Sequence, residues 1–268
     1  MNKALTFWTA PVTALFLPKV YHDASKSSAG RGVLYVLYLS ALSVLLAMWF
    51  LLALVVPKAD QFSKWFGSNM PVMTWTPDGL SWNGPQSVKM EHPQYGLVAI
   101  FDMDKTNVNE EDFGSAYVYV TSHRLFIKKK PGEVQEFDLT RTGEEAQRLP
   151  PKIQITENVA AQVYKNMKRS MLVIIPIVFL LFFFFLHLLS NLFYSLVGLF
   201  LNLTRKTKLG YGAIFNLTCF ATTAGFALMC LKALLPIAIP FIVYIAINVV
   251  YLVVVFKVTD QKAPAAQA

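Results

Sequence analysis

Long runs of apolar residues that carry no charge alternate with polar segments along this chain of 268 residues. The longest run extends for 34 residues, from Met171 to Thr204. A helix needs about 20 apolar residues to cross the hydrocarbon core of a bilayer, and four runs meet this requirement. We therefore predict an α-helical integral membrane protein with four transmembrane helices, at residues 32–56, 170–203, 211–231 and 233–257.

The polar segment 57–169 lies between the first two apolar runs and has the pattern of a small folded domain. Turn residues such as Pro77-Asp78-Gly79 separate short β-branched and aromatic runs. We predict a small, mostly β, largely antiparallel domain inserted between the first and second transmembrane helices. Helices are expected at its two ends, Ala59–Phe66 and Thr156–Met171, the second continuing into the membrane. The predicted strands are Val72–Thr76, Leu80–Trp82, Ser87–Glu91, Gly96–Phe101, Ala116–Thr121, Leu125–Lys129 and Val134–Leu139.

The distribution of charge predicts the side of the membrane on which each segment lies. The net charge is +8, yet the stretch Pro57–Arg169 is neutral, with 14 basic and 14 acidic residues. The excess cations flank the apolar runs, and such loops stay in the cytoplasm. We expect a protein of the bacterial inner (cytoplasmic) membrane with both termini in the cytoplasm and the 57–169 domain outside. The predicted cytoplasmic segments are residues 1–31, 204–210 and 258–268.

The cytoplasmic lead contains apolar residues at helical spacing, Leu5, Trp8, Val12 and Leu15/Phe16. This pattern predicts an amphipathic helix that lies in the membrane interface ahead of the first span. Such a helix would contact membrane lipids, which we expect among the partners of this protein. A nucleic acid is not expected as a partner.

An enzyme-like motif stands at the end of one predicted strand, Asp102-Met103-Asp104-Lys105-Thr106. It resembles the Asp-x-Asp-x-Thr signature of haloacid-dehalogenase-type phosphatases, which implies Asp102 as nucleophile and Asp104 as acid/base beside Mg²⁺. That chemistry requires a parallel sheet with long crossovers. The nine residues Asn107–Ser115 favour a hairpin loop instead, and the paired acidic motif near the C-terminus is missing. The phosphatase is therefore a remote alternative.

Acidic residues continue along this loop and make it a candidate contact surface of the exported domain. The loop does not match the EF-hand calcium-binding pattern, because its sixth position is Asn107 instead of glycine and its twelfth is Phe113 instead of glutamate. His92 and His123 are isolated, and Cys219 and Cys230 lie within a predicted membrane helix, so we expect no cofactor, metal site or disulfide. The candidate contact residues are Asp102, Asp104, Glu110, Glu111 and Asp112.

Polar residues within the apolar runs are candidates for function, because each one is costly inside a bilayer. At helical spacing they fall on one face of the second, third and fourth predicted membrane helices. One interpretation is helix packing through interhelical hydrogen bonds. The other is a polar cavity for a solute, a proton or a lipid headgroup, in which His187 is the titratable group. The candidates are His187, Asn191, Tyr194, Asn216, Thr223 and Asn248.

The order of three short motifs resembles a known family. They are Phe16-Leu17-Pro18-Lys19-Val20-Tyr21, the basic approach Gly30-Arg31-Gly32 before the first span, and the Asp102-x-Asp104-x-Thr106 element before three further spans. The arrangement is similar to a bacterial multi-pass membrane protein family of unknown function that includes maltodextrin-utilisation-type membrane proteins and is distantly Yip-like. The resemblance implies four spans with an extracytoplasmic insert. It implies no established activity and no catalytic residues.

Together these patterns predict a non-enzymatic accessory or scaffold subunit whose exported domain docks another envelope protein. A transporter or lipid-handling subunit is the alternative, with a polar cavity between the second, third and fourth transmembrane helices. The sequence leaves the oligomeric state and the identity of the partner open.

Overall fold

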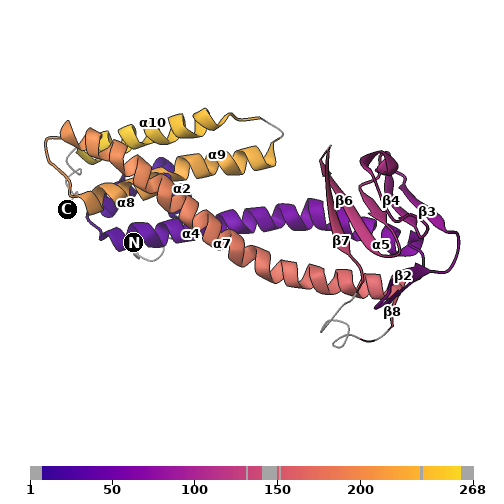
Figure 1. Cartoon of the computed structure of the whole chain (residues 1–268). Coiled ribbons are helices and arrows are strands. Elements are labelled where there is room, and N and C mark those ends of the chain that lie inside the picture. The colour runs from indigo at the N-terminus through magenta and orange to yellow at the C-terminus, as the bar shows by residue number, and fades with distance from the viewer. Residues whose placement is uncertain (1–7, 131, 141–149, 151, 236–237, 261–268) are drawn as a thin grey trace. The chain divides into compact units, whose positions relative to one another are not determined.

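The computed structural model describes residues 8–130, 132–140, 150, 152–235 and 238–260. The chain divides into two compact units. The first unit combines the chain up to Leu51 with the chain from Val173 onward, and its described part is helical. The second unit, Leu52–Leu172, contains all the described strands (Figure 1).

Four helical segments in the described part of the chain are long and apolar enough to cross a membrane: Ala29–Asn69, Glu157–Leu203, Tyr211–Leu234 and Phe241–Asp260. The first three contain the predicted apolar runs 32–56, 170–203 and 211–231, whereas the fourth overlaps the predicted run 233–257 but begins only at Phe241. Helix α7 (Glu157–Leu203) is continuous for 47 residues despite Pro176 in its interior. It therefore joins the predicted stretch Thr156–Met171 to the second apolar run without interruption, as expected.

The first long segment is a helix with a defect. Helix α4 (Ala29–Phe50) continues through a π-helical turn, η1 (Leu51–Val55), into α5 (Val56–Asn69). Pro57 lacks the N–H that would bond back along the helix, and its ring displaces the carbonyl four residues earlier. The wider π turn, which contains the residue four positions before Pro57, accommodates this loss.

The third segment differs from one straight helix. It consists of α8 (Tyr211–Ala221) and α9 (Thr223–Leu234), with a turn at Thr222, where φ is −66° and ψ is −6°. Helix α10 (Phe241–Asp260) follows. Apolar periodicity does not reveal such a break, because both halves present equally apolar surfaces.

Two short helices precede the first long segment, α2 (Ala10–Phe16) and α3 (Pro18–Ser25). Proline disfavours helical backbone in the residue before it, so α2 ends at Phe16 and Leu17, which precedes Pro18, is extended. Small residues such as Ala10 and Ala14 are buried against the helices of this unit. The predicted stripe faces outward, with Trp8, Val12 and Phe16 being 62%, 64% and 76% exposed. An interfacial position stays a prediction, and Leu5 and residues 261–268 lie outside the described residues.

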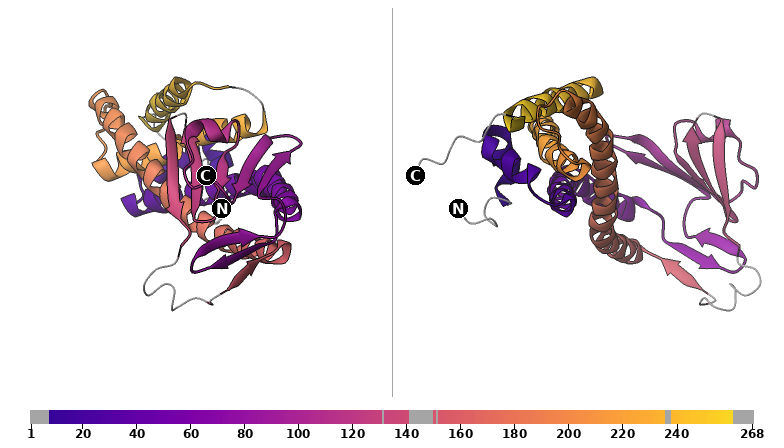
Figure 2. Two further views of the ribbon diagram at one scale, coloured as in Figure 1. Left: turned by 45° about the vertical axis from the view of Figure 1, so that its right-hand side comes forward. Right: turned by 90° about the vertical axis from the view of Figure 1, so that its left-hand side faces the viewer.

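The described strands of the second unit form two sheets (Figure 2). The smaller sheet has the order β2-β1-β8, with both pairings antiparallel. It contains β1 (Met73–Thr76), β2 (Gly79–Trp82) and β8 (Ile153–Ile155). Strand β8 was not predicted, because Ile-Gln-Ile is too short to give a periodic signal.

The larger sheet has the order β3-β4-β5-β6-β7. Its strands are β3 (Ser87–His92), β4 (Gly96–Asp102), β5 (Val118–Val120), β6 (Arg124–Lys130) and β7 (Glu133–Asp138). Each overlaps a predicted run. Successive side chains of β4 point to opposite faces of the sheet and contribute to two hydrophobic clusters. Ala99 and Phe101 pack with residues of the smaller sheet, whereas Ile100 belongs to the second cluster.

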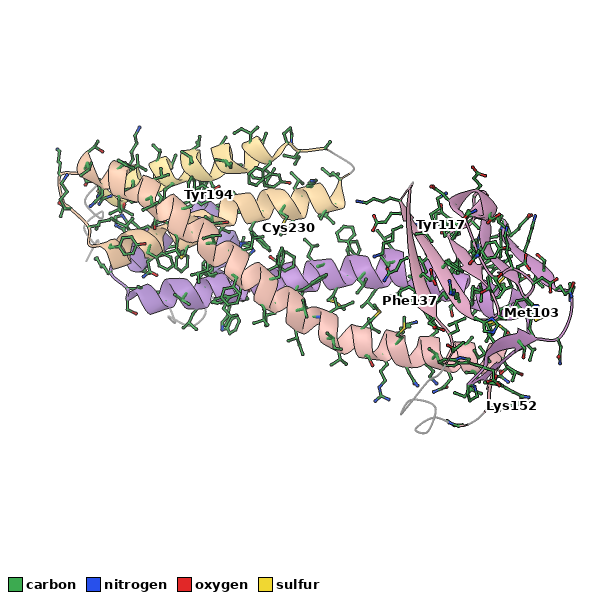
Figure 3. The ribbon with its side chains drawn as sticks, viewed as in Figure 1. Met103, Tyr117, Phe137, Lys152, Tyr194 and Cys230 are labelled. Carbon is green, nitrogen blue, oxygen red and sulfur yellow. The ribbon has the colours of Figure 1, made fainter. Side chains whose placement is uncertain are left out.

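The hairpin predicted for Asn107–Ser115 is wrong. Strands β4 and β5 pair in parallel, with Phe101 opposite Val120. Residues 103–117 therefore cross over the sheet, and Figure 3 labels Met103 at the start and Tyr117 at the end of this crossover. It contains the short 3-10 helix η2 (Glu110–Phe113), whose Phe113 is fully buried in the same cluster as Ile100. Phe113, with Ala116 in the same cluster and Val108 packed against it, anchors a segment that is otherwise mostly polar.

Candidate functional site

Asn248, one of the predicted intramembrane polar residues, bonds to α9 just after the break in the third segment and to α7. Its Oδ1 accepts the backbone N–H of Gly225 at 2.9 Å, and its Nδ2 donates to the Tyr194 hydroxyl at 3.3 Å. The first N–H groups of a helix have no partner within that helix, and Gly225 lies in the first turn of α9. The Asn248 side chain therefore satisfies one of them and links α9, α10 and α7.

Asn191 and His187 on α7 also bond to other elements. The Thr222 hydroxyl donates to Asn191 Oδ1 at 3.2 Å, and Asn191 Nδ2 donates to the main-chain carbonyl of His187 at 2.8 Å. His187 Nε2 lies 3.2 Å from the Ser43 hydroxyl on α4. The turn at Thr222 is thus bonded to α7, and Gly225, three residues after it, is bonded to α10.

Thr223 and Asn216 bond to the N-terminal part of the chain. The hydroxyls of Thr223 and Tyr35 lie 2.8 Å apart. Asn216 Nδ2, which carries two hydrogens, lies within hydrogen-bond distance (2.8–3.2 Å) of three main-chain carbonyls around the α3–α4 connection, those of Ala24, Ser27 and Ser28. All six predicted residues therefore bond between elements of the first unit, the arrangement that the helix-packing interpretation predicts.

The acidic loop is held by an ion pair within it and by contacts of Glu110 with the β6–β7 hairpin. The Glu110 carboxylate accepts the Gly132 N–H at 3.0 Å and lies 3.3 Å from Lys128 Nζ. Asp112 pairs with Lys105. The Gly132 hydrogen bond and Lys128 hold the pKa of Glu110 below its usual value, and Lys105 does the same for Asp112. These carboxylates fasten the crossover, while Glu111 is exposed.

Asp102 is likewise engaged within the domain. Its Oδ2 accepts the Tyr119 hydroxyl at 3.0 Å, and its Oδ1 accepts the backbone N–H of Asp104 at 3.2 Å. Burial, followed by this hydrogen bond, raises the pKa of Tyr119. The parallel β4–β5 pairing removes the objection to a phosphatase that rested on a hairpin. However, no group of three His, Cys, Asp or Glu residues within the described ranges could hold a metal ion.

The second unit carries an aromatic cluster that the sequence did not reveal. Phe62 and Trp65 of α5 meet His92 and Tyr95 of the β3–β4 turn. The His92 ring centroid lies 4.5 Å from that of Trp65 and 4.6 Å from that of Tyr95. Its Nδ1 accepts the Gln94 N–H at 3.0 Å, which holds the ring against the turn. Tyr95 is 52% exposed, so the cluster reaches the surface.

His92 was predicted to be isolated because its neighbours in sequence are not those in space. The hairpin register places His92 opposite Gly96, so the turn between them carries Tyr95 back over the imidazole. The available signal was a short turn, Pro93 to Gly96, directly after a histidine and between two strand-like runs. The contact with α5 required the tertiary structure.

The architecture is compatible with a multi-pass membrane protein, because four helical segments in the described chain are long and apolar enough to cross a membrane. Every described strand lies between the first and second of these segments in sequence. A family model described as "Protein of unknown function (DUF1189)" matches residues 8–257. The chain belongs to this family, and the expected kinship with a family of unknown function is confirmed at that level. Comparisons with curated proteins and with solved structures gave no significant match.

Proposed function

We propose that this protein is a non-enzymatic accessory or scaffold subunit of the bacterial inner membrane whose second unit docks another envelope protein. The aromatic cluster of Phe62, Trp65, His92 and Tyr95 supports this proposal. Tryptophan and tyrosine dominate the energetics of protein interfaces. Rings that are already packed against one another lose little conformational freedom when a partner binds.

Helix α5, which carries Phe62 and Trp65, is bonded to α7 within the second unit. Lys168 Nζ on α7 lies 2.8 Å from the Asp60 carboxylate on α5, and the Tyr164 hydroxyl donates to the same carboxylate at 2.8 Å. Ser68 near the end of α5 donates to Glu157 at the start of α7 at 3.1 Å. Helix α5 therefore presents Phe62 and Trp65 from a braced position.

The proposal includes the topology expected from charge, with the termini in the cytoplasm and the second unit outside. In a variant whose two cysteines are replaced by alanine, Glu111→Cys should react with a membrane-impermeant maleimide in intact cells. Lys206→Cys should react only after permeabilisation. The opposite labelling pattern would show that the second unit lies in the cytoplasm, and would contradict the proposed topology. Kinship with maltodextrin-utilisation-type and Yip-type proteins stays a prediction that rests on the short motifs alone.

The docking function is tested by site-specific photocrosslinking in cells. A benzophenone amino acid at position 95 should crosslink one envelope protein, and the same group at Tyr117 should not. Tyr117 is a matched control, because it is 60% exposed on the same unit but outside the aromatic cluster. The identified protein should copurify with the wild type and the Tyr117→Ser variant, and be lost from Tyr95→Ser. Equal products at both positions, or no product from a fully expressed protein, would refute docking through this cluster.

A further inference from the structure

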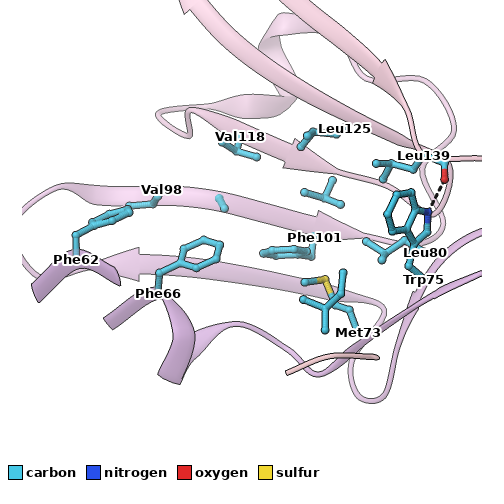
Figure 4. A pocket seen from close by; sticks show the side chains of 13 residues that line it. Phe62, Phe66, Met73, Trp75, Leu80, Val98, Phe101, Val118, Leu125 and Leu139 are labelled. Carbon is cyan, nitrogen blue, oxygen red and sulfur yellow. Dashed lines mark hydrogen bonds between the residues drawn. The ribbon is translucent and has the colours of Figure 1, made fainter. Parts of the chain in front are cut away.

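An apolar pocket of about 410 Å³ opens in the second unit between its two sheets and α5. Figure 4 shows Phe62 and Phe66 of α5 toward one end and Trp75 with Leu139 toward the other. The side chains of Val118 and Leu125 border it from the larger sheet. The volume lies within the range of small-molecule sites, roughly 300–1,000 Å³.

The lining offers nothing for water to bond. All thirteen lining residues are apolar or aromatic, and the one polar side-chain atom among them, Trp75 Nε1, donates to the Leu139 carbonyl at 2.6 Å. A buried water needs two to four polar partners, so an apolar space of this kind does not hold ordered water. Native cores also contain few voids larger than a water molecule. The lining therefore matches an aliphatic ligand.

The chain itself brings the pocket walls close to apolar membrane-type segments along the sequence. Phe62 and Phe66 lie on α5, which continues directly from α4 through η1. On the other side, Ile155 lines the pocket two residues before α7 begins at Glu157, and the apolar run of α7 starts further along the helix at Met171. The wall formed by α5 therefore lies on the helix that leads straight into the first apolar run, with Phe62 six residues after the end of that run at Val56. A bilayer is the source of aliphatic chains at such positions.

A basic residue, Lys58, lies on α5 one helical turn before the pocket-lining Phe62. Lys58 precedes Phe62 by one helical turn, so the two side chains share a face of the helix. Lys58 is exposed and lies on the side of Phe62 that leads toward η1. An ammonium group at this position is complementary to the phosphate of a lipid headgroup.

From the volume, the apolar lining, the connectivity and Lys58, we infer that this pocket binds an acyl chain of a membrane glycerophospholipid, with the phosphate near Lys58. The inference does not depend on the docking function, because a lipid chain can fill the pocket whether or not a protein covers the aromatic cluster. It assigns the second unit a lipid-binding role that its strand pattern does not indicate.

Photolabelling of the full-length protein in nanodiscs tests this site. The nanodiscs contain phosphatidylethanolamine and phosphatidylglycerol, with a trace of phosphatidylglycerol that carries a diazirine in its acyl chain. After illumination, mass spectrometry of the digested wild type should locate adducts on pocket residues of β4 and β5, such as Val98 and Val118. Adducts on exposed residues of α7, such as Phe185, serve as an internal reference for lipid contact.

Two variants on neighbouring positions separate binding in the pocket from general lipid contact. Val118→Trp fills the pocket and should abolish the adducts there while leaving those on α7. Tyr117→Trp adds a ring next to it but outside the pocket lining, and should label like the wild type. If Val118→Trp does not fold, the wild-type adduct map still decides. Adducts confined to the apolar helices would overturn the inference, as would pocket labelling by a free diazirine fatty acid but not by the phospholipid.

Discussion

The side chain of Asn248 accepts a hydrogen bond from the backbone N–H of Gly225 at the point where the third apolar segment is interrupted. The two residues fit each other closely: a Cβ atom at Gly225 would lie 2.6 Å from both amide atoms of Asn248. The absence of a side chain at one position thus makes room for the amide at the other. This pair couples α9 to α10 by hydrogen bonding and by shape.

Replacement of Asn248 by leucine should destabilise the protein. The Gly225 N–H would remain buried without an acceptor, which costs about 1–3 kcal/mol. The measurement is the free energy of unfolding in a mixture of mild detergent and SDS. Val250→Leu is the matched control, because Val250 lies on the same helix and is 62% exposed. Equal stability of both variants would show that the amide is dispensable.

The Gly225→Ala variant should also be less stable than the wild type. The added methyl group meets the Asn248 amide and forces it away, and overpacking of this kind costs about 1–3 kcal/mol. At Gly212 a Cβ would meet only the Ala29 Cβ at 3.6 Å, an ordinary contact. Gly212→Ala should therefore be neutral or stabilising, since alanine favours helix. Thermal unfolding of the two purified variants distinguishes them, and similar losses in both would contradict the prediction.

Arg205 should matter for stability, although it appears in the sequence as one of several basic loop residues. Its guanidinium donates to the Phe256 carbonyl at 2.7 Å and to the Thr259 carbonyl at 3.1 Å, and so caps the end of α10. Arg205→Gln should lower the free energy of unfolding by about 1.5–3 kcal/mol, as expected for hydrogen bonds to a charged group. Lys206→Gln removes the same charge from an exposed neighbour and should change it little. Similar effects of the two would indicate a role of charge alone.

Acid should loosen the crossover between β4 and β5. The pKa of Glu110 is held low by the Gly132 hydrogen bond and Lys128, so its contribution to stability is present above the ordinary glutamate pKa. This contribution is lost as the pH falls below about 4 and Glu110 takes up a proton. Hydrogen exchange of residues 103–117 in the full-length protein, corrected for the intrinsic pH dependence, should therefore accelerate in acid.

Glu110→Gln should exchange faster already at neutral pH and respond less to acid, because the pairing with Lys128 is gone. Glu111→Gln, an adjacent and exposed change, should behave like the wild type. A crossover whose exchange is equally slow in Glu110→Gln at neutral pH would show that burial of Phe113 alone holds it in place.

Strand positions in the second unit were predictable because each predicted run has a local signal. Pro77-Asp78-Gly79 gives a turn between β1 and β2, and Gly79 adopts the positive φ, 134°, that this turn requires. The parallel pairing of β4 with β5 was not predictable in this way. It depends on Phe113 finding a buried site next to Ile100, and a single aromatic residue in a polar loop carries no periodicity.

The predicted intramembrane candidates were selected because polar side chains are energetically costly in a bilayer and because these residues recur at helical spacing. These two criteria identified Asn248 and Tyr194 but did not specify their hydrogen-bond partners. Their bonds depend on which helices are adjacent and on the break at Thr222. The aromatic cluster shows the same limit, since Trp65 and His92 belong to different elements.

The sequence by itself determined the four apolar helical segments, the strand-rich insert and the charge asymmetry, because hydrophobic burial and turn geometry act through neighbours along the chain. Only the tertiary structure decided the broken third segment, the two-sheet insert, the parallel crossover and the apolar pocket. Each of these depends on contacts between residues distant in sequence, such as Gly225 with Asn248. Such contacts form, and contribute to the free energy of folding, only when the elements pack together.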